Sequence, residues 1–526
     1  MKNIWQGNEK LAKEIVSRFP HPARIYALED LFPTWANACL EGRVDEAWRF
    51  LEIARVIGLT LVDIHNDHQI KDSLSAIVAN LEVSFLNNSN LLILTDRQHK
   101  LAIAHSFCKN GREFYREYQL EKALSLFVKA QNIFAELNDT SSHLTTTFFL
   151  ARCQLEQFNY VKAFDLLNKI LLTAEKNNYP NLLGLCWYSL GTIQLYQLEL
   201  SQALLSQKSA LKYLKQIDDT ENMAMANILI TGILERVGDK NKIWFYQYQA
   251  LVSFAQFPKS VKQMRILLGS TLSLSKLGET RSALCFINQQ IRVATESNDH
   301  LFLSTSFFYR SQINYQLNNT TEALLDLDKA KEYLKLIPNP IYQKRTSQEI
   351  EIIESSYKLK TDPKIVVEKL NSIIETNGNT LDRYHFTSIY YSRALAYISL
   401  GEYKKAELDL ETSIKEIERE RKIIDNEEHK ITFFQKPQKT YETMIELQAI
   451  FQKNAILAFN YTEDARARAL LDSFSTKLLN PINSELNKSY KANSLPLKLA
   501  EIQDKLPENT AIIEYKMLNN YLLIWV

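Results

Sequence analysis

An alanine recurs every forty residues through the middle of the chain. Steps of forty from Ala123 reach Ala163, Ala203, Ile243, Ala283 and Ala323. The next step is forty-three residues, to Val366, and the spacing of forty then returns at Ala406. A fixed period in this range is typical of repeat arrays, in which each unit buries its apolar face only against its neighbours. The period therefore predicts an elongated stack of similar units.

Each unit has the pattern of two helices joined by a short turn. Phe107, Gly111 and Phe114 are spaced four and three residues apart, and the same helical spacing follows from Ala123 through Phe127. Small residues at Gly111 and Ala123 let the two helices approach closely. Glycine and proline number only 12 each in 526 residues, so the sequence favours long helices and short turns.

The segment WYSLGTIQLYQLELSQALLSQKSALKYL gives the unit most completely. It places Trp187, Leu190 and Gly191 before Ala203 and Ala210. This order resembles the tetratricopeptide repeat (TPR), whose standard unit has about 34 residues. The resemblance implies an all-α, TPR-like α-solenoid, a right-handed superhelix with a period of about 40 residues. About eight units fit between Ile93 and Lys422.

Composition narrows the classes of function. The net charge is +1, so no basic excess points to nucleic acid or to a membrane surface. No signal-peptide pattern and no membrane-spanning apolar run is present in the sequence, which predicts a cytoplasmic protein. No phosphate-binding loop or dinucleotide fingerprint occurs, and no cofactor is expected.

In TPR proteins the first helix of each unit lines a concave surface, and one column here is mostly apolar and aromatic. We interpret it either as packing between repeats or as a groove for a peptide or protein partner. Polar neighbours of the column would assist such a groove. The candidate groove residues are His105, Cys108, Arg112, Phe148, Tyr188, Phe308, Gln312 and Tyr391.

Other chemistry is weakly indicated. His65 and His68, beside Asp63 and Asp67, have a spacing that could hold a metal on one helix face, but no third distant ligand accompanies them. A polar surface turn is the alternative interpretation. The five cysteines form no pair motif, which favours buried thiols over a disulfide framework or a zinc site. No catalytic residue and no metal site is therefore predicted.

The ends of the chain differ from the array. Residues 1–92 read as an N-terminal helical cap, and residues 93–480 as the array with its terminal helices. Residues 481–496 are rich in Asn, Ser and Lys and read as a linker. Residues 497–526 contain a short helix and two strands joined at Asn519 and Asn520. A lone hairpin is marginally stable, so we expect it to lie poorly ordered or against the final helices.

The order of these last segments resembles the start of the CHAT domain, a caspase-like cysteine peptidase domain that commonly follows TPR arrays. The matching residues are Arg466, Arg468, Leu470, Leu471, Asp472, Leu499, Ile502, Leu506, Pro507, Thr510, Glu514, Tyr515 and Trp525. The family's catalytic His and Cys would lie beyond Val526, so no catalytic position transfers to this chain. The hairpin is then expected to be the first part of a domain that this chain does not complete.

Together these patterns predict a regulatory scaffold that binds a protein or peptide and transmits that event to a peptidase domain. Two alternatives remain open. In the first, the chain is a truncated piece of a peptidase and is inert alone. In the second, it is a stand-alone TPR adaptor in protein–protein interaction, whose hairpin is coincidental or pairs with another chain.

Overall fold

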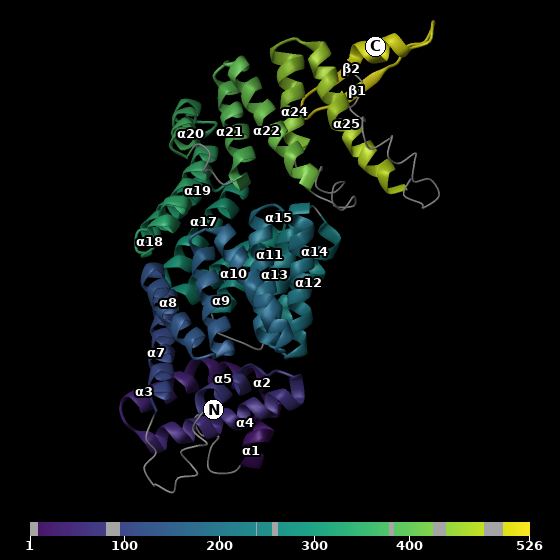
Figure 1. Ribbon diagram of the computed structural model, residues 1–526. Coiled ribbons are helices and arrows are strands. Elements are labelled where there is room, and N and C mark those ends of the chain that lie inside the picture. Colours follow the sequence, from purple (N-terminus) through teal and green to yellow (C-terminus); the bar gives the residue numbers. More distant parts are fainter. Residues whose placement is uncertain are drawn as a thin grey trace.

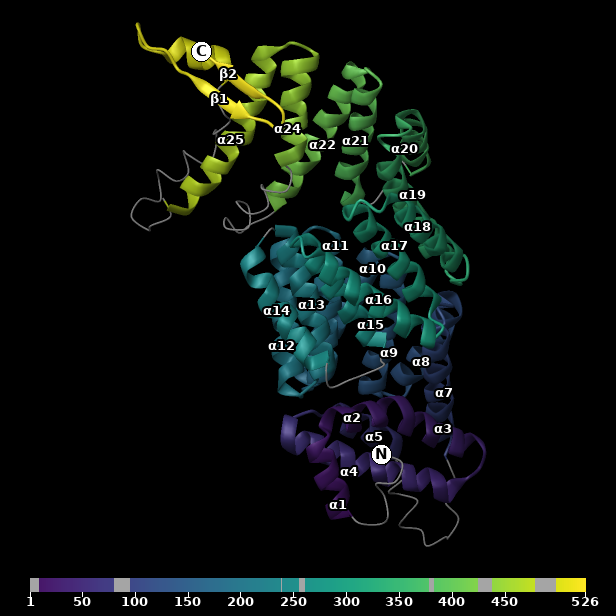
Figure 2. The same ribbon diagram turned by 180° about the vertical axis from the view of Figure 1, so that it is seen from behind.

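The computed structural model describes residues 9–79, 95–237, 239–254, 261–377, 383–423, 438–477 and 498–526. Within them the chain is a TPR-like α-solenoid that ends on a two-stranded hairpin (Figure 1). The N-terminal helices lie at one end of the molecule and the hairpin lies at the other (Figures 1 and 2).

Eight helix pairs make up the described array. They are α7 (Asp96–Arg116) with α8 (Leu120–Glu136), α9 (Thr140–Glu156) with α10 (Tyr160–Lys176), α11 (Pro180–Tyr196) with α12 (Leu200–Gln216), α13 (Thr220–Val237) with α14 (Lys240–Phe254), α15 (Val261–Lys276) with α16 (Thr280–Glu296), α17 (His300–Gln316) with α18 (Thr320–Leu334), α19 (Pro340–Lys358) with α20 (Pro363–Asn377), and α21 (Arg383–Ser399) with α22 (Tyr403–Ile423). We number these pairs as units one to eight. Each first helix packs on its own second helix and on the first helix of the next unit.

A helix of 17 residues and a turn of three produce half of the forty-residue period. The turn after α8 shows how. Asn138 is left-handed (φ 56°), and its N–H donates to the Ala135 carbonyl at 3.2 Å. The Asp139 N–H donates to the Phe134 carbonyl at 2.9 Å, which completes a Schellman motif. The Asp139 carboxylate then caps the next helix by accepting from the Ser142 N–H at 3.0 Å. Three residues thus close one helix and open the next.

The alanine column lies in the interior of every unit. Ile243 is 3% exposed, and the seven other members of the column are 0% exposed. Gly111 of α7 faces α8 at very close range, because a Cβ there would lie 2.7 Å from the Phe127 ring. The predicted close approach of the two helices is therefore confirmed.

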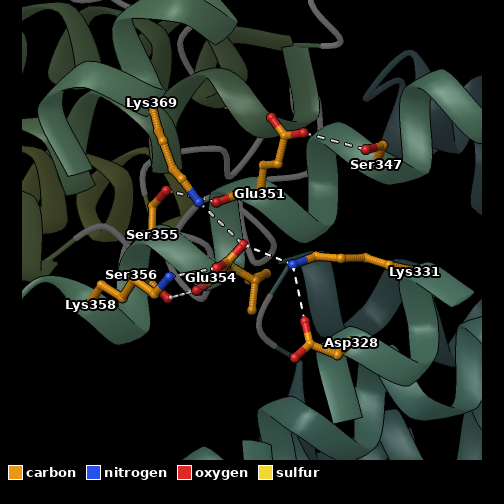
Figure 3. A network of polar contacts seen from close by, with 10 residues as sticks. Asp328, Lys331, Ser347, Glu351, Glu354, Ser355, Ser356, Lys358 and Lys369 are labelled. Carbon is orange, nitrogen blue, oxygen red and sulfur yellow. Dashed lines mark hydrogen bonds and ion pairs between the residues drawn. The ribbon is translucent and has the colours of Figure 1, made fainter. Parts of the chain in front are cut away.

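The three-residue slip lies within unit seven. Helix α19 has 19 residues, against 17 in α17, and the turn that follows is also one residue longer. Lys358, the last residue of the lengthened helix, donates to Glu354 at 2.7 Å. Lys331 of α18 and Lys369 of α20 reach the same carboxylate at 3.0 Å and 3.3 Å (Figure 3). One buried acid thus ties three helices together where the period changes.

A second polar device occurs twice, in units six and eight. Arg310 binds both carboxylate oxygens of Asp326 at 2.9 and 2.7 Å and donates to Asn288 at 2.9 Å. The corresponding residues of unit eight repeat this clamp, with Arg393 bound to Asp409 and to Asn371 at 2.6 to 2.7 Å. Each clamp fixes a first helix to two second helices.

The N-terminal cap consists of α1 (Glu9–Arg18), α2 (Pro20–Ile25), the π-helix η1 (Tyr26–Leu31), α3 (Phe32–Leu40), α4 (Val44–His65) and α5 (Gln69–Val78). Helix α3 packs on α7, and α5 runs beside the turns between the first units. The Ser73 hydroxyl donates to Ser141 at 2.8 Å, and the Tyr179 hydroxyl donates to Asp72 at 2.7 Å. The cap is therefore joined to the array by polar contacts at successive turns.

The C-terminal segments lie against the last helices, which are α24 (Gln438–Glu446), the π-helix η3 (Leu447–Phe451) and α25 (Ala455–Lys477). Helix α27 (Leu499–Lys505) precedes the antiparallel strands β1 (Glu514–Met517) and β2 (Leu522–Trp525). The Trp525 indole N–H donates to the Ala455 carbonyl at 3.0 Å, and its ring packs on Phe459. The hairpin is thus laid against the final helices (Figure 2). The predicted linker, 481–496, lies outside the described residues.

No helix in the described part of the chain is both long and apolar enough to span a membrane. Four of the five cysteines are buried, as expected, but Cys285 is exposed. It lies on α16, whose buried residues include Ala283 and Ile287 on the opposite helix face.

Candidate partner-binding surface

Most of the predicted groove residues lie inside the packed molecule. His105, Cys108, Arg112, Phe148 and Phe308 are each 7 to 8% exposed, whereas Tyr188, Gln312 and Tyr391 are partly exposed. Phe148 shares a core cluster with residues of α11, and Phe308 shares one with residues of α19. The column therefore points largely between neighbouring first helices.

The N-terminal cap covers the beginning of this column. The His105 ring stacks on Phe32 at 5.4 Å and meets Trp35 and Phe134 edge-on at 5.8 and 5.0 Å. Burial lowers the pKa of His105 to about 3, so the imidazole is neutral. The Arg112 guanidinium donates to the Glu29 carbonyl at 3.2 Å. These two residues join the cap to the array.

The histidines of the candidate metal turn serve the same junction. The Arg24 side chain donates to Asp67 at 2.7 Å, and His65 lies 3.4 Å from Asp218. Asp67 is 1% exposed, whereas Asp63 and Asn66 are exposed, so the turn is buried at this junction on one side and open to solvent on the other. Among the residues that the structure describes, no group of His, Cys, Asp and Glu side chains could hold a metal ion.

A different set of side chains gathers on the inner side of the superhelix. The Arg152 guanidinium of α9 donates to the Tyr115 hydroxyl at 3.3 Å and to Glu156 at 3.2 Å. The Tyr115 hydroxyl in turn donates to Glu156 at 3.1 Å. Tyr188 of α11 and Arg265 of α15 lie within electrostatic range of this group. We call Tyr115, Arg152, Glu156, Tyr188 and Arg265 the inner cluster.

Next to the inner cluster, unit seven reaches back to units two and three. The Arg345 guanidinium of α19 lies over the Phe158 ring at 4.0 Å and over the Tyr196 ring at 5.7 Å. It also donates to the Tyr160 hydroxyl at 3.2 Å, across 185 residues of sequence. We call these four residues the cross-brace. Because residues so distant in sequence meet here, their side chains face the interior of the superhelix.

The inner side chains remain partly accessible. The side chain of Arg152 is 14% exposed and that of Glu156 is 25% exposed, and Tyr196 is 41% exposed. Burial raises the pKa of Tyr115 and of Tyr196, which keeps both hydroxyls protonated. Burial alone would lower the pKa of Arg152, but its electrostatic interactions with Tyr115 and Glu156 raise it. The surface therefore offers fixed cations, neutral hydroxyls and aromatic faces.

Sequence reasoning missed Arg152, although it stands forty residues after Arg112 in the same column. The repeat therefore offered a signal for Arg152. It offered none for Arg265 and Arg345, which stand eighty residues apart in another column, because their importance depends on how the superhelix curves. Tyr188 is the one predicted groove residue that belongs to the inner cluster.

No protein-family model matches the sequence, and neither does any curated protein. Solved structures that resemble it include a Rap protein complexed with competence and sporulation factor, with 13% identity and a TM-score of 0.45 over 67% of this chain and 99% of that one. The quorum sensor NprR from B. thuringiensis has 13% identity and a TM-score of 0.45 over 75% and 99%. The TPR2AB domain of yeast Sti1, in complex with pHSP90, has 14% identity and a TM-score of 0.21 over 63% and 98%. Identities and TM-scores this low transfer no ligand, partner or activity.

Proposed function

We propose that the chain is a regulatory scaffold whose inner surface binds an extended segment of a protein or peptide. The inner cluster carries this proposal, because it presents tyrosine and arginine side chains that are held in place and still partly accessible. Tyrosine and arginine contribute strongly to binding energy at protein interfaces. Burial raises the pKa of Tyr115 and keeps its hydroxyl protonated, which suits hydrogen bonding better than nucleophilic attack.

Site-specific photo-crosslinking tests where the partner binds. A photoreactive phenylalanine analogue replaces Tyr196, which is 41% exposed on the inner side, in the full chain expressed in its own cells. The matched control replaces Leu172 of α10, which is 79% exposed. We expect one protein or peptide to crosslink from position 196 and not from position 172. Crosslinking from 172 alone, or equally from both positions, would count against an inner binding surface.

We further propose that the scaffold is the regulatory arm of a CHAT-type peptidase. The hairpin supports this proposal by its two unlike faces. Leu523 and Trp525 pack towards α24 and α25. On the other face Tyr515, Met517, Leu522 and Ile524 are 57 to 74% exposed, although all four are apolar or aromatic. A sheet with one solvated face normally places polar residues there, so this face suits a strand pair within a larger domain.

Contacts between the segments that resemble the CHAT domain support the same proposal. Arg466 of α25 donates to the Tyr515 carbonyl at 3.2 Å and pairs with Glu514 at 2.9 Å. The Leu499 N–H donates to the Asn460 side chain of α25 at 3.0 Å. Helix α25, helix α27 and the hairpin thus form one packed group.

Sequencing the gene past the codon for Val526 distinguishes the peptidase arm from a stand-alone adaptor. A continued reading frame that encodes a His and a Cys, each after a predicted strand, is expected for the peptidase arm. A stop codon would favour the stand-alone adaptor. In that case the exposed hairpin face is expected to pair with another chain, which light scattering would detect as a complex larger than the 61.0 kDa monomer.

A further inference from the structure

One guanidinium of the inner cluster has no hydrogen-bond acceptor among the residues that the structure describes. Arg265 is partly buried on α15, and none of its five N–H donors makes a hydrogen bond or ion pair with a described residue. Arg152, by contrast, donates to Tyr115 and Glu156. No nitrogen of Arg265 is among the fully buried polar atoms without a partner, so its donors reach solvent and are open to an acceptor that is supplied from outside.

The charges around Arg265 define what that acceptor must be. Arg152 and Arg265 contribute two positive charges to the inner cluster, and Glu156 contributes one negative charge. The Glu156 carboxylate is already engaged by Arg152 and by Tyr115. Tyr188 and Tyr118 are the other groups within electrostatic range of Arg265, and burial raises the pKa of Tyr118, which keeps its hydroxyl neutral. The site therefore has one positive charge more than its own residues balance.

We propose that Arg265, beside Arg152, binds a carboxylate of an acidic peptide segment. This inference rests on the proposed function, since it assumes that the inner surface receives a peptide. The planar fork of a guanidinium matches a carboxylate in a bidentate contact, and partial burial strengthens that contact. Tyr115, Tyr118 and Tyr188 lie within electrostatic range of Arg265, and aromatic side chains of this kind can pack against the rest of the segment.

Selection from a peptide library tests the proposal without a known partner. Random twelve-residue peptides displayed on phage are selected on the immobilised full chain, and the recovered sequences are compared with the input library. We expect Asp and Glu to be enriched at one or two fixed positions. Peptides selected without any acidic enrichment would overturn the carboxylate site and leave the proposed function intact. Recovery of no peptide above background would overturn both.

Variants of the full chain locate the contact. Against the best selected peptide, Arg265→Gln is expected to bind about tenfold or more weakly, and Arg265→Lys should recover part of the loss. Arg292→Gln, on the exposed side of α16, is the matched control and should bind as the wild type does. Circular dichroism checks that each variant is folded. Equal affinity of Arg265→Gln and wild type would overturn the proposal.

The peptide itself identifies which carboxylate is bound. Replacing the enriched Glu of the peptide by Gln should weaken binding to the wild-type chain as much as Arg265→Gln does. The same peptide change should cause no further loss of affinity for the Arg265→Gln variant. If amidation of the peptide C-terminus has this effect instead, the bound group is the terminal carboxylate. If neither change weakens binding, the carboxylate proposal is wrong.

Discussion

At Gly111 the first helix of the array comes so close to the second that one methyl group would overlap the Phe127 ring. Phe127 is fully buried and stacks on Phe149 at 5.3 Å, so it has little room to move. We expect Gly111→Ala to lower the free energy of unfolding by about 1–3 kcal/mol, although alanine favours helices. Urea denaturation followed by circular dichroism measures the change.

Gly232 is the matched control for this prediction. It also lies within a first helix, α13, but a Cβ there would have no atom within 4 Å. Gly232→Ala should therefore stabilise the chain by about 0.5–1 kcal/mol through backbone entropy alone. A stabilising Gly111→Ala would contradict the packing described for unit one.

We expect Glu354 to make the stability of the array depend on pH. Burial alone would raise the pKa of this carboxyl, but Lys358, Lys331 and Lys369 lower it to about 2 from its ordinary 4.5. Because the folded pKa is the lower one, the ion pairs stabilise the fold above about pH 4.5. That contribution is lost as the pH falls from 4.5 towards 2.

Glu354→Gln should therefore cost roughly 1–3 kcal/mol at pH 7 and progressively less below pH 4.5. Glu351→Gln is the control on the same helix, because Glu351 accepts only a 3.4 Å side-chain contact from Ser347 in Figure 3. Guanidinium denaturation at a series of pH values gives both curves. Parallel curves for Glu354→Gln and wild type would contradict this assignment.

Single residues could be predicted from the sequence where the repeat constrains them. The alanine column and Gly111 face a neighbouring helix in each unit, and periodicity alone identifies such positions. Partner-facing residues are constrained less directly. Cys108, Phe148 and Phe308 share the periodicity of a lining column, yet they pack between helices, since an apolar side chain fits either location. Only the relative placement of the units distinguishes the two.

At the scale of elements, the two helices of unit six begin in different ways. The Asp299 carboxylate caps the first helix of unit six by accepting from the Phe302 N–H at 3.1 Å. Asn319 precedes the second helix of the same unit and makes no side-chain cap hydrogen bond. We expect Asp299→Ala to cost about 1 kcal/mol and Asn319→Ala to cost much less. Thermal unfolding of the two variants compares the caps, and equal losses would contradict the difference.

The helices themselves follow from the sequence, but two of their details do not. The slip of the period is visible in the sequence, whereas its division between a longer α19 and a longer turn is not. The left-handed turn residues include Phe158 and Leu198, with φ of 60° and 65°. Large side chains are uncommon in this conformation. Tertiary packing explains both, because Leu198 is buried and Phe158 carries the Arg345 stack.

At the scale of the whole molecule, the curvature of the array creates contacts that no single unit contains. Ile417 of unit eight joins the core cluster that includes Ile230 and Ile233 of unit four. Arg345 of unit seven reaches units two and three. Periodicity fixes the order of the units but not the rotation between them, so these contacts could not be predicted from the sequence.

The cross-brace is expected to hold the superhelix at its observed curvature. Arg345→Ala removes the stack on Phe158 and Tyr196 and the hydrogen bond to Tyr160, and should cost about 1–2 kcal/mol. Since these contacts join distant units, their loss should also let the superhelix open. Small-angle X-ray scattering should then give a larger radius of gyration, and hydrogen exchange should accelerate in the turn between α9 and α10.

Lys344→Ala is the control, because Lys344 is the exposed neighbour of Arg345 on the same helix. It should leave the scattering curve and the exchange rates unchanged. A partner that fills the inner surface of the Arg345→Ala variant would restore the compact form, since it replaces the lost link between units. An Arg345→Ala chain with wild-type scattering and exchange would mean that helix packing alone fixes the curvature, and that the cross-brace only lines the surface.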